Sequence, residues 1–410
     1  MWALSLAKSL MYVLMISSTY YFFGYPNNES YGYGQINVDV VYILMCALVV
    51  IFGVYLFHKE YEKPSDYFLL LYGMIVLMPY ALLYDVWGGF SAVNFIAVLV
   101  PFFGVMFFCR VRLRVLPVTV VSEEGLVKFI LLLSAFSVVA LLINSPVSSS
   151  FSLADSHVRR LESRELYGTR TFVAYMSSIV MNCMLPLMFF WGVLRSRVVF
   201  VVFSIFLYVG FYYIYGVKAP LMYMFFAGGF AYFLRRGGGE VRFFNGIYYI
   251  FLSIFILAWV EFLLFGYSYV EDYLIRRVFY VGSYLVGAYL QVIGGADFSF
   301  ATGLLVSKSA SMYVGEDFLG VAGLNANTNA FLYLLLQYGL GGYLCAMTLV
   351  GIVLVYLNSL RLRSEVFVFV SLMFGVLILE QSVTTALLSS GIGMASVLFY
   401  FSRKLENNRV

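Results

Sequence analysis

The run VDVVYILMCALVVIFGVYLF, residues 38 to 57, is followed at once by the charged loop HKEYEK, residues 58 to 63. Roughly 20 mainly apolar residues are enough to cross the hydrocarbon core of a bilayer as a helix. Similar runs recur along the chain, which is 63% hydrophobic and only 11% charged, whereas a soluble domain is roughly 25% charged. This composition predicts a helical bundle that has lipid as its main solvent.

The apolar runs on either side of this stretch predict an all-α fold, a polytopic integral membrane bundle of about twelve transmembrane helices. No small-residue cleavage site follows the first run, so we expect that run to stay as a span. We expect residues 1–410 to form a single integral membrane domain. The twelve runs lie near residues 4–24, 38–57, 67–84, 92–109, 126–144, 172–194, 198–216, 219–234, 243–265, 329–357, 366–380 and 384–402.

The charges of the short loops predict the orientation of the bundle. The loops YPNNESYGYGQIN (25–37) and DVWGGFS (85–91) contain no Lys or Arg. Since Lys and Arg gather in cytoplasmic loops, both termini are predicted to be cytoplasmic. The basic loops, all on the opposite face, are HKEYEK (58–63), RVRLR (110–114), RSR (195–197), RRGGGEVR (235–242), RLR (361–363) and RKLENNR (403–409).

Two long polar loops are predicted on the extracytoplasmic side, at residues 145–171 and 266–328. Long structured loops between short ones usually carry function. The segment YVEDYLIRRVFYVGSYLVGAYLQV (269–292) in the larger loop predicts an interfacial amphipathic helix. On such a helix Asp272 and Arg276 stand four residues apart and can pair. The aromatic residues that recur there at helical spacing are Tyr273, Tyr280 and Tyr284.

Basic residues on the extracytoplasmic face break the charge asymmetry of the loops. Arginine binds phosphate oxygens in a bidentate manner, so a cluster beside apolar helices suits a lipid-linked phosphate or diphosphate. The same pattern also fits solvated loop charge or contact with lipid headgroups. The cations concerned are Arg159, Arg160, Arg164, Arg170, Lys218, Arg276, Arg277 and Lys308.

A base for proton transfer has several candidates on the same face, and spacing alone does not rank them. Asp297 and Asp317 follow glycines, where a flexible backbone can approach a substrate. His157 lies beside three arginines in SLADSHVRRLESRELYG. These three residues are the predicted catalytic candidates, and the remaining ones are Asp155, Glu162, Glu165, Glu271, Asp272, Glu316 and Glu380.

Sequence signatures of other enzyme classes are missing. No Walker loop, HExxH or GxSxG motif occurs, and GGG at 237–239 lacks the strand and helix of a nucleotide loop. The four cysteines form no close-spaced ligand pair. We therefore expect no metal site, no cofactor and no nucleic-acid partner.

The chain resembles the O-antigen and capsule repeat-unit polymerases, the Wzy family, across most of its length. The likeness is carried by topology and by short motifs in their order along the chain. These motifs are HVRRLESRELYG (157–168), YGVKAP (215–220), IRRVFYVGSYLVGAYLQV (275–292), NANTNAFLYLLLQYGLGGYL (325–344) and TALLSSGIG (385–393).

This resemblance implies a fold similar to the C-type membrane glycosyltransferases, in the cytoplasmic (inner) membrane of a bacterium, with the active face extracytoplasmic. It implies transfer of a growing glycan from undecaprenyl diphosphate to an incoming lipid-linked unit. The implied partners are undecaprenyl-diphosphate-linked oligosaccharides, the lipid bilayer, a chain-length regulator and a flippase. The residues implied as diphosphate or glycan contacts are Arg159, Arg160, Arg164, Lys218, Arg276 and Arg277. The rings of Tyr273, Tyr280 and Tyr284 are amphipathic, so their spacing fits either a sugar face or anchoring at the membrane interface.

Three alternatives remain at this point. A polysaccharide flippase or transporter is expected to have midplane charges or repeated halves, and the sequence has neither. An O-antigen ligase of the related family keeps a histidine in its large outer loop, whereas residues 266–328 contain none. A non-catalytic membrane partner would use the outer loops as docking surfaces.

Overall fold

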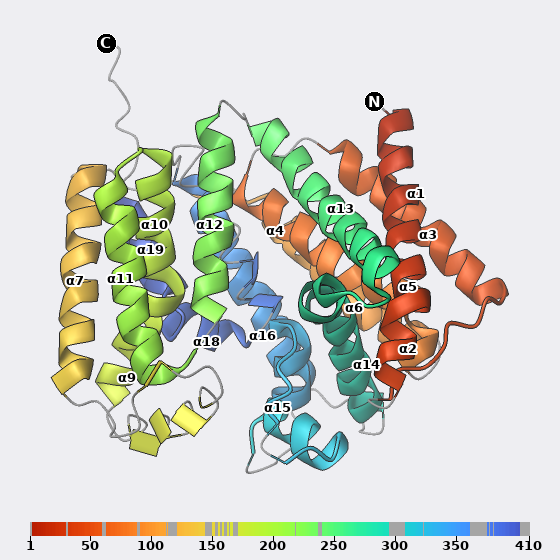
Figure 1. Ribbon diagram of the computed structural model, residues 1–410. Coiled ribbons are helices and arrows are strands. Elements are labelled where there is room, and N and C mark those ends of the chain that lie inside the picture. The colour runs from red at the N-terminus through yellow and green to blue at the C-terminus, as the bar shows by residue number, and fades with distance from the viewer. Residues whose placement is uncertain are drawn as a thin grey trace. The chain divides into compact units, whose positions relative to one another are not determined.

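The computed structural model describes residues 2–29, 32–59, 63–87, 91–111, 113, 121–143, 150–151, 155, 158–159, 162–163, 165–166, 171–217, 219–236, 240–294, 308–322, 324–360, 375–376, 378–379 and 381–401. All regular elements in these ranges are helices, and none is a strand (Figure 1). The chain divides into two compact units. Unit 1 comprises Met1–Val111, Phe244–Val355 and Ile378–Val383, and unit 2 comprises Arg112–Phe243, Tyr356–Leu377 and Thr384–Val410.

Unit 1 contains the helices of the N-terminal quarter together with those of the second long loop. Several of its helices pass into short π-helical segments, written η here. Its elements are α1 (Trp2–Thr19), η1 (Tyr20–Gly24), α2 (Tyr25–Asn28), α3 (Val40–His58), α4 (Pro64–Tyr72), η3 (Gly73–Leu77), α5 (Met78–Leu82), the 3₁₀ turn η4 (Asp85–Trp87), α6 (Ala92–Phe108), most of α13 (Glu240–Phe265), η6 (Glu271–Tyr280), α14 (Val281–Gly294), α15 (Ala310–Met312), η7 (Tyr313–Phe318) and most of α16 (Ala330–Ser359).

Unit 2 is built mainly from the middle of the chain. Helix α10 packs against both α11 and α12 in this unit. Its elements are α7 (Glu123–Ile143), α9 (Thr171–Ile179), the π-helical η5 (Val180–Met184), α10 (Leu185–Leu194), α11 (Val198–Tyr215), α12 (Ala219–Arg235), α18 (Val383–Leu388) and α19 (Ile392–Phe401).

Seven helices in the described ranges are long and apolar enough to cross a membrane, each matching a predicted span. The prediction of a helical membrane protein is confirmed at this coarser level. Two further predicted spans are shorter apolar helices, Val93–Phe108 and Ile392–Phe401, and the number twelve stays a prediction. Most of the predicted span 366–380 lies outside the described residues. The seven are Val40–His58, Pro64–Leu82, Glu124–Ile143, Phe172–Leu194, Val198–Tyr215, Gly246–Phe265 and Ala330–Ser359.

Residues from the predicted basic and uncharged loops lie at different ends of unit 1. At one end the Trp2 ring stacks on His58 with ring centroids 4.2 Å apart. At the other end the Asn37 side chain donates to Asp85 at 3.0 Å. Helix α1 runs between these ends, from the N-terminus to α2 (Figure 1). His58 therefore lies at the opposite end of the unit from Asn37 and Asp85, and the side of the membrane that each end faces stays a prediction.

The π-helical segments fall into two groups, one in which a proline follows the segment and one in which none does. Segments η1, η3 and η5 are each followed within two residues by a proline, namely Pro26, Pro79 and Pro186. Proline has no N–H to donate and crowds the carbonyl four residues before it, and a π-turn with its i to i+5 bonds accommodates this. No proline lies in or after η6 or η7. These two segments, where π-helix has no such local cause, are the ones that carry adjacent acidic residues.

Candidate functional site

The predicted site residues that the structure describes are divided between the two units. Arg159 belongs to unit 2, and the predicted residues of η6, α14 and η7 belong to unit 1. Each group is described in its own unit, so their assembly into one site stays a prediction. The predicted residues that lie outside the described ones are His157, Arg160, Arg164, Arg170, Lys218, Asp297 and Glu380.

Arg159 is fully buried in unit 2. Its Nη1 donates to the carbonyl of Tyr213 at 3.4 Å, and its guanidinium lies over the Tyr212 ring, 5.1 Å from the centroid. Ser163 donates to the carbonyl of Ile214 at 2.9 Å. Both side chains thus reach the last turn of α11, where backbone carbonyls have no partner within the helix. This arrangement supports a structural role for Arg159, and its substrate role stays a prediction.

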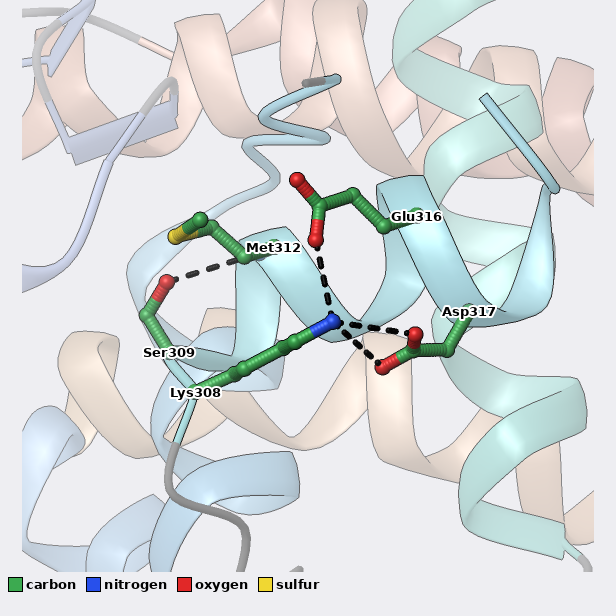
Figure 2. A network of polar contacts seen from close by, with 5 residues as sticks. All are labelled: Lys308, Ser309, Met312, Glu316 and Asp317. Atoms are coloured by element: carbon green, nitrogen blue, oxygen red, sulfur yellow. Dashed lines mark hydrogen bonds and ion pairs between the residues drawn. The ribbon is translucent and has the colours of Figure 1, made fainter. Parts of the chain in front are cut away.

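Asp317 lies on η7 and is held by an ammonium group (Figure 2). Lys308 Nζ lies 3.0 Å from Glu316 Oε2 and 3.1 Å from Asp317 Oδ1. These bonds raise the pKa of Lys308. The Asp317 side chain is 42% exposed, so this carboxylate is in contact with both solvent and the ammonium of Lys308.

The predicted pair on η6 is present. Arg276 Nε lies 2.7 Å from Asp272 Oδ1 and also donates to the Asp272 carbonyl at 3.2 Å. The next residue, Arg277, is exposed and makes no ion pair with any described residue. One arginine is thus fixed by an acid, and the other is available to an anion.

Glu271 is the unusual residue of η6. Its side chain is fully buried, and neither carboxylate oxygen has a hydrogen-bond partner in the described part of the chain. Burial raises the pKa of Glu271 to about 7, and Asp272 adds to the rise while Arg276 and the nearby Asn27 oppose it. A carboxyl with this pKa can take up and release a proton at neutral pH.

The start of η6 is fixed from two directions, which places Glu271. The backbone N–H of Glu271 donates to Ser268 Oγ at 3.0 Å. Ser268 in turn donates to Glu261 Oε2 of α13 at 2.9 Å, and the same oxygen accepts from Val270 N–H at 2.9 Å. The N–H groups at the start of a helix lack intrahelical partners. Glu261 and Ser268 satisfy them here and hold the turn that carries Glu271.

Aromatic rings surround the buried end of η6. Tyr280 meets Tyr20 edge to face at 5.1 Å, and Tyr33 lies 4.9 Å from Trp87 and 5.7 Å from Tyr284. The Tyr33 hydroxyl and Trp87 Nε1 are buried without hydrogen bonds among the described residues. Buried polar atoms usually have partners, so both atoms of this wall are exceptions, and the Tyr33 phenol lies near enough to Glu271 for its charge to act on it.

The charges on η6 reach the tyrosines of this wall. Burial raises the pKa of Tyr33 and of Tyr280. The charge of Glu271 adds to both rises, whereas Arg276 lowers the pKa of Tyr33 and Thr19 lowers that of Tyr280. The two phenols therefore stay protonated, and both lie close enough to Glu271 to sense its ionisation.

The predicted tyrosine stripe does not behave as one face. Tyr280 is fully buried, Tyr284 is half-buried and Tyr273 is exposed. The i to i+5 bonding of η6 rotates side chains away from their α-helical positions. Tyr273 and Arg277 therefore lie on the exposed side of the segment, and Tyr280 lies with the buried carboxyl.

A signal for Glu271 was present in the sequence. Ile275 and Phe279 follow it at intervals of four residues, and both are buried. An acid in register with the apolar stripe of an amphipathic helix is the sequence pattern of a buried carboxyl. The residues Asn27, Tyr33 and Trp87 carried no such signal, because they lie more than 180 residues away along the chain.

Among the described residues, no group of three His, Cys, Asp or Glu side chains could hold a metal ion. The groups of η6 offer proton transfer through Glu271 and anion binding through arginine. The search of protein-family models, curated proteins and solved structures found no match to this chain.

Proposed function

We propose that this protein is a membrane glycosyltransferase that polymerises lipid-linked oligosaccharide repeat units, of the O-antigen or capsule type. It transfers the growing glycan from undecaprenyl diphosphate to an incoming lipid-linked unit. The sequence resemblance to the Wzy polymerases supplies the reaction. The observation that carries the proposal is the fully buried carboxyl of Glu271, which forms no ion pair with any described residue and stands one helical turn from Arg276 and Arg277.

The proposed step uses these groups in distinct roles. The acceptor hydroxyl oxygen attacks the anomeric carbon of the donor glycan, and its proton passes to the Glu271 carboxylate. The bond between the anomeric carbon and the diphosphate oxygen breaks, and undecaprenyl diphosphate leaves with the electron pair. Arg277, together with the terminal nitrogens of Arg276, offsets the charge that develops on the diphosphate.

The proposed setting follows the loop charges. The protein lies in the bacterial cytoplasmic membrane, with both termini cytoplasmic and η6 at the extracytoplasmic face. A flippase would deliver its substrates, and a chain-length regulator would act beside it. This sidedness is tested in a cysteine-free variant: Arg277→Cys should react with a membrane-impermeant maleimide from outside intact cells, and Arg236→Cys only after lysis. The reverse pattern would overturn the site's placement.

The main test is elongation by the full-length protein, purified into lipid nanodiscs with a synthetic undecaprenyl-diphosphate-linked repeat unit. We expect a ladder of products. Arg277→Ala should leave single units and remove the longer products. Arg277→Lys keeps the charge without the bidentate geometry, so its products show which of the two properties elongation requires. Arg236→Ala, which removes another exposed arginine, is the matched control and should keep the ladder. Folded wild-type protein that makes no ladder contradicts the polymerase assignment.

One observation also favours a second function, a proton-coupled flippase or transporter. A buried carboxyl that titrates near neutral pH is typical of proton relays, and Glu271 has this property. A transporter predicts that lipid-linked units cross a proteoliposome membrane, that a pH gradient drives the crossing and that Glu271→Gln stops it. An O-antigen ligase instead predicts transfer to a lipid A core acceptor and no repeat-unit ladder.

A further inference from the structure

The π-helical form of η6 gives one arginine two acidic neighbours. Hydrogen bonds in a π-helix join residues i and i+5, so Glu271 and Arg276 stand one turn apart on neighbouring positions. Asp272 precedes Arg276 by four residues and also lies beside it. The guanidinium is therefore within reach of one acid that it binds and of another that it does not.

Asp272 holds Arg276 by a single nitrogen. Arg276 Nε lies 2.7 Å from the Asp272 carboxylate and 3.2 Å from the Asp272 carbonyl. The two terminal nitrogens of Arg276 make no hydrogen bond with any described residue. Asp272 thus fixes the base of the guanidinium and leaves its outer edge available, while Glu271 receives no hydrogen bond from it.

Few other groups near Glu271 could neutralise its charge. Glu261 on α13 is bound to Ser268 and to Val270 N–H, and Asn27 on α2 is uncharged. The remaining titratable or charged neighbours, from the loops and helices packed against η6, are Tyr20, Tyr33, Tyr267, Arg277, Tyr280 and Tyr284. The tyrosines are neutral near pH 7 and Arg277 lies on the exposed side of η6, so Arg276 is the cation that a competing acid can keep from Glu271.

We propose that Asp272 is a positioning residue, which holds Arg276 by Nε so that the guanidinium does not pair with Glu271 and its terminal nitrogens stay open to an anion. Without Asp272, Arg276 turns to Glu271 and the two form a buried ion pair. The carboxyl is then ionised at all physiological pH values, and the cation is no longer presented outward. This inference rests on the proposed function only for the use of Glu271 as the base.

The test measures the protonation of Glu271 directly. Infrared difference spectra of the full-length protein in nanodiscs, taken as a function of pH, show the carbonyl stretch of a buried protonated carboxyl, and Glu271→Gln identifies the band. In the wild type we expect a midpoint near pH 7. Asp272→Asn should lower the midpoint by about one pH unit or more, because an opposite charge then pairs with Glu271. Asp272→Glu should restore it, and Asp317→Asn should leave it unchanged.

A double-mutant cycle separates positioning from the charge of Asp272 itself. In the Arg276→Gln background, Asp272→Asn removes only a neighbouring negative charge, so it should lower the midpoint by clearly less than in the wild type. An equal shift in both backgrounds, or no shift in the wild type, overturns the proposal. The infrared band is measured without a glycan substrate. A missing product ladder therefore contradicts the polymerase function and leaves the role of Asp272 in positioning Arg276 unaffected. If elongation is present, the pH at which its rate rises should move down with the midpoint in Asp272→Asn.

Discussion

Segments η6 and η7 have nearly the same local chemistry and different environments. Each is π-helical, each carries two adjacent acids, and each acid pair has a cation within nine residues. On η7 the ammonium of Lys308 binds both Glu316 and Asp317 in partly exposed positions. On η6 the guanidinium binds one acid and leaves Glu271 buried among aromatic rings. Burial raises the pKa of Glu271 to about 7, so the surroundings of the acid, and not merely a cation nearby, set its proton chemistry.

The largest expected difference between the two segments is in elongation. Glu271→Gln keeps the shape of the side chain and removes its basicity, so we expect the rate to fall about 100-fold or more. Asp317→Asn should leave the rate close to that of the wild type, since its acid is solvated and paired. Both rates are measured with lipid-linked repeats in nanodiscs at equal protein amounts. A loss confined to Asp317→Asn would reverse the comparison and place the base on η7.

The next effect is on stability, and its sign follows from the pKa of Glu271. The folded protein holds this proton up to about pH 7, whereas the unfolded chain releases it near the ordinary value of 4.5. The free energy of unfolding should therefore fall as the pH rises from about 4.5 to about 7. Above that range the ionised carboxylate costs about 3 kcal/mol. Glu271→Gln should remove the cost.

Thermal unfolding of the two proteins in one detergent, from pH 4 to pH 8.5, measures this difference. We expect similar stability for wild type and Glu271→Gln at the acid end and a more stable variant at the alkaline end. Asp317→Asn is the matched control and should follow the wild type. Parallel curves for wild type and Glu271→Gln would show that Glu271 is already solvated or paired in the folded protein.

Much of the fold could be predicted from hydropathy, because each span depends on its own residues. The run 38–57 predicted a helix that is observed as Val40–His58, and the spacing of Asp272 and Arg276 predicted their ion pair. The helix predicted within the second long loop is present as Glu271–Gly294. These features are local, so the sequence determines them directly.

The ranking of the acids could not be predicted, because burial depends on distant residues. Glycine neighbours favoured Asp317 in the sequence, yet its segment is helical and Lys308 binds it. Glu271 was one of ten candidates, and Asn27 and Tyr33, which lie near it, come from the N-terminal quarter of the chain. No proline near η6 indicates its π-helical geometry in the sequence. The different exposures of Tyr273 and Tyr280 could therefore not be predicted.

A smaller effect should follow from loosening the rings that pack beside η6. A Cβ at Gly287 of α14 would lie 2.5 Å from Trp87 Cβ, so Gly287→Ala must displace Trp87. Overpacking of this kind typically costs about 1–3 kcal/mol, so we expect lower thermal stability. Water that enters beside the displaced ring should also lower the protonation midpoint of Glu271. Gly282→Ala on the same helix has nothing within 4 Å of its Cβ and should be neutral or slightly stabilising. Equal melting temperatures for the two variants would show that the Trp87 wall yields freely.

The smallest effect is expected at Lys308, and a large effect there would contradict the assignment of the base to η6. Its ammonium binds two acids, but the side chains of Lys308 and Asp317 are 40% and 42% exposed, and ion pairs of this kind contribute little to stability. Lys308→Gln should leave the melting temperature unchanged within error, at both low and high salt, because screening already weakens the pair. Elongation should also be unchanged. A large loss of elongation in Lys308→Gln with normal stability would mean that η7 acts on the substrate. Asp317 would then regain the catalytic role that its sequence context predicted, and Glu271 would be left as a buried proton-binding group of the fold.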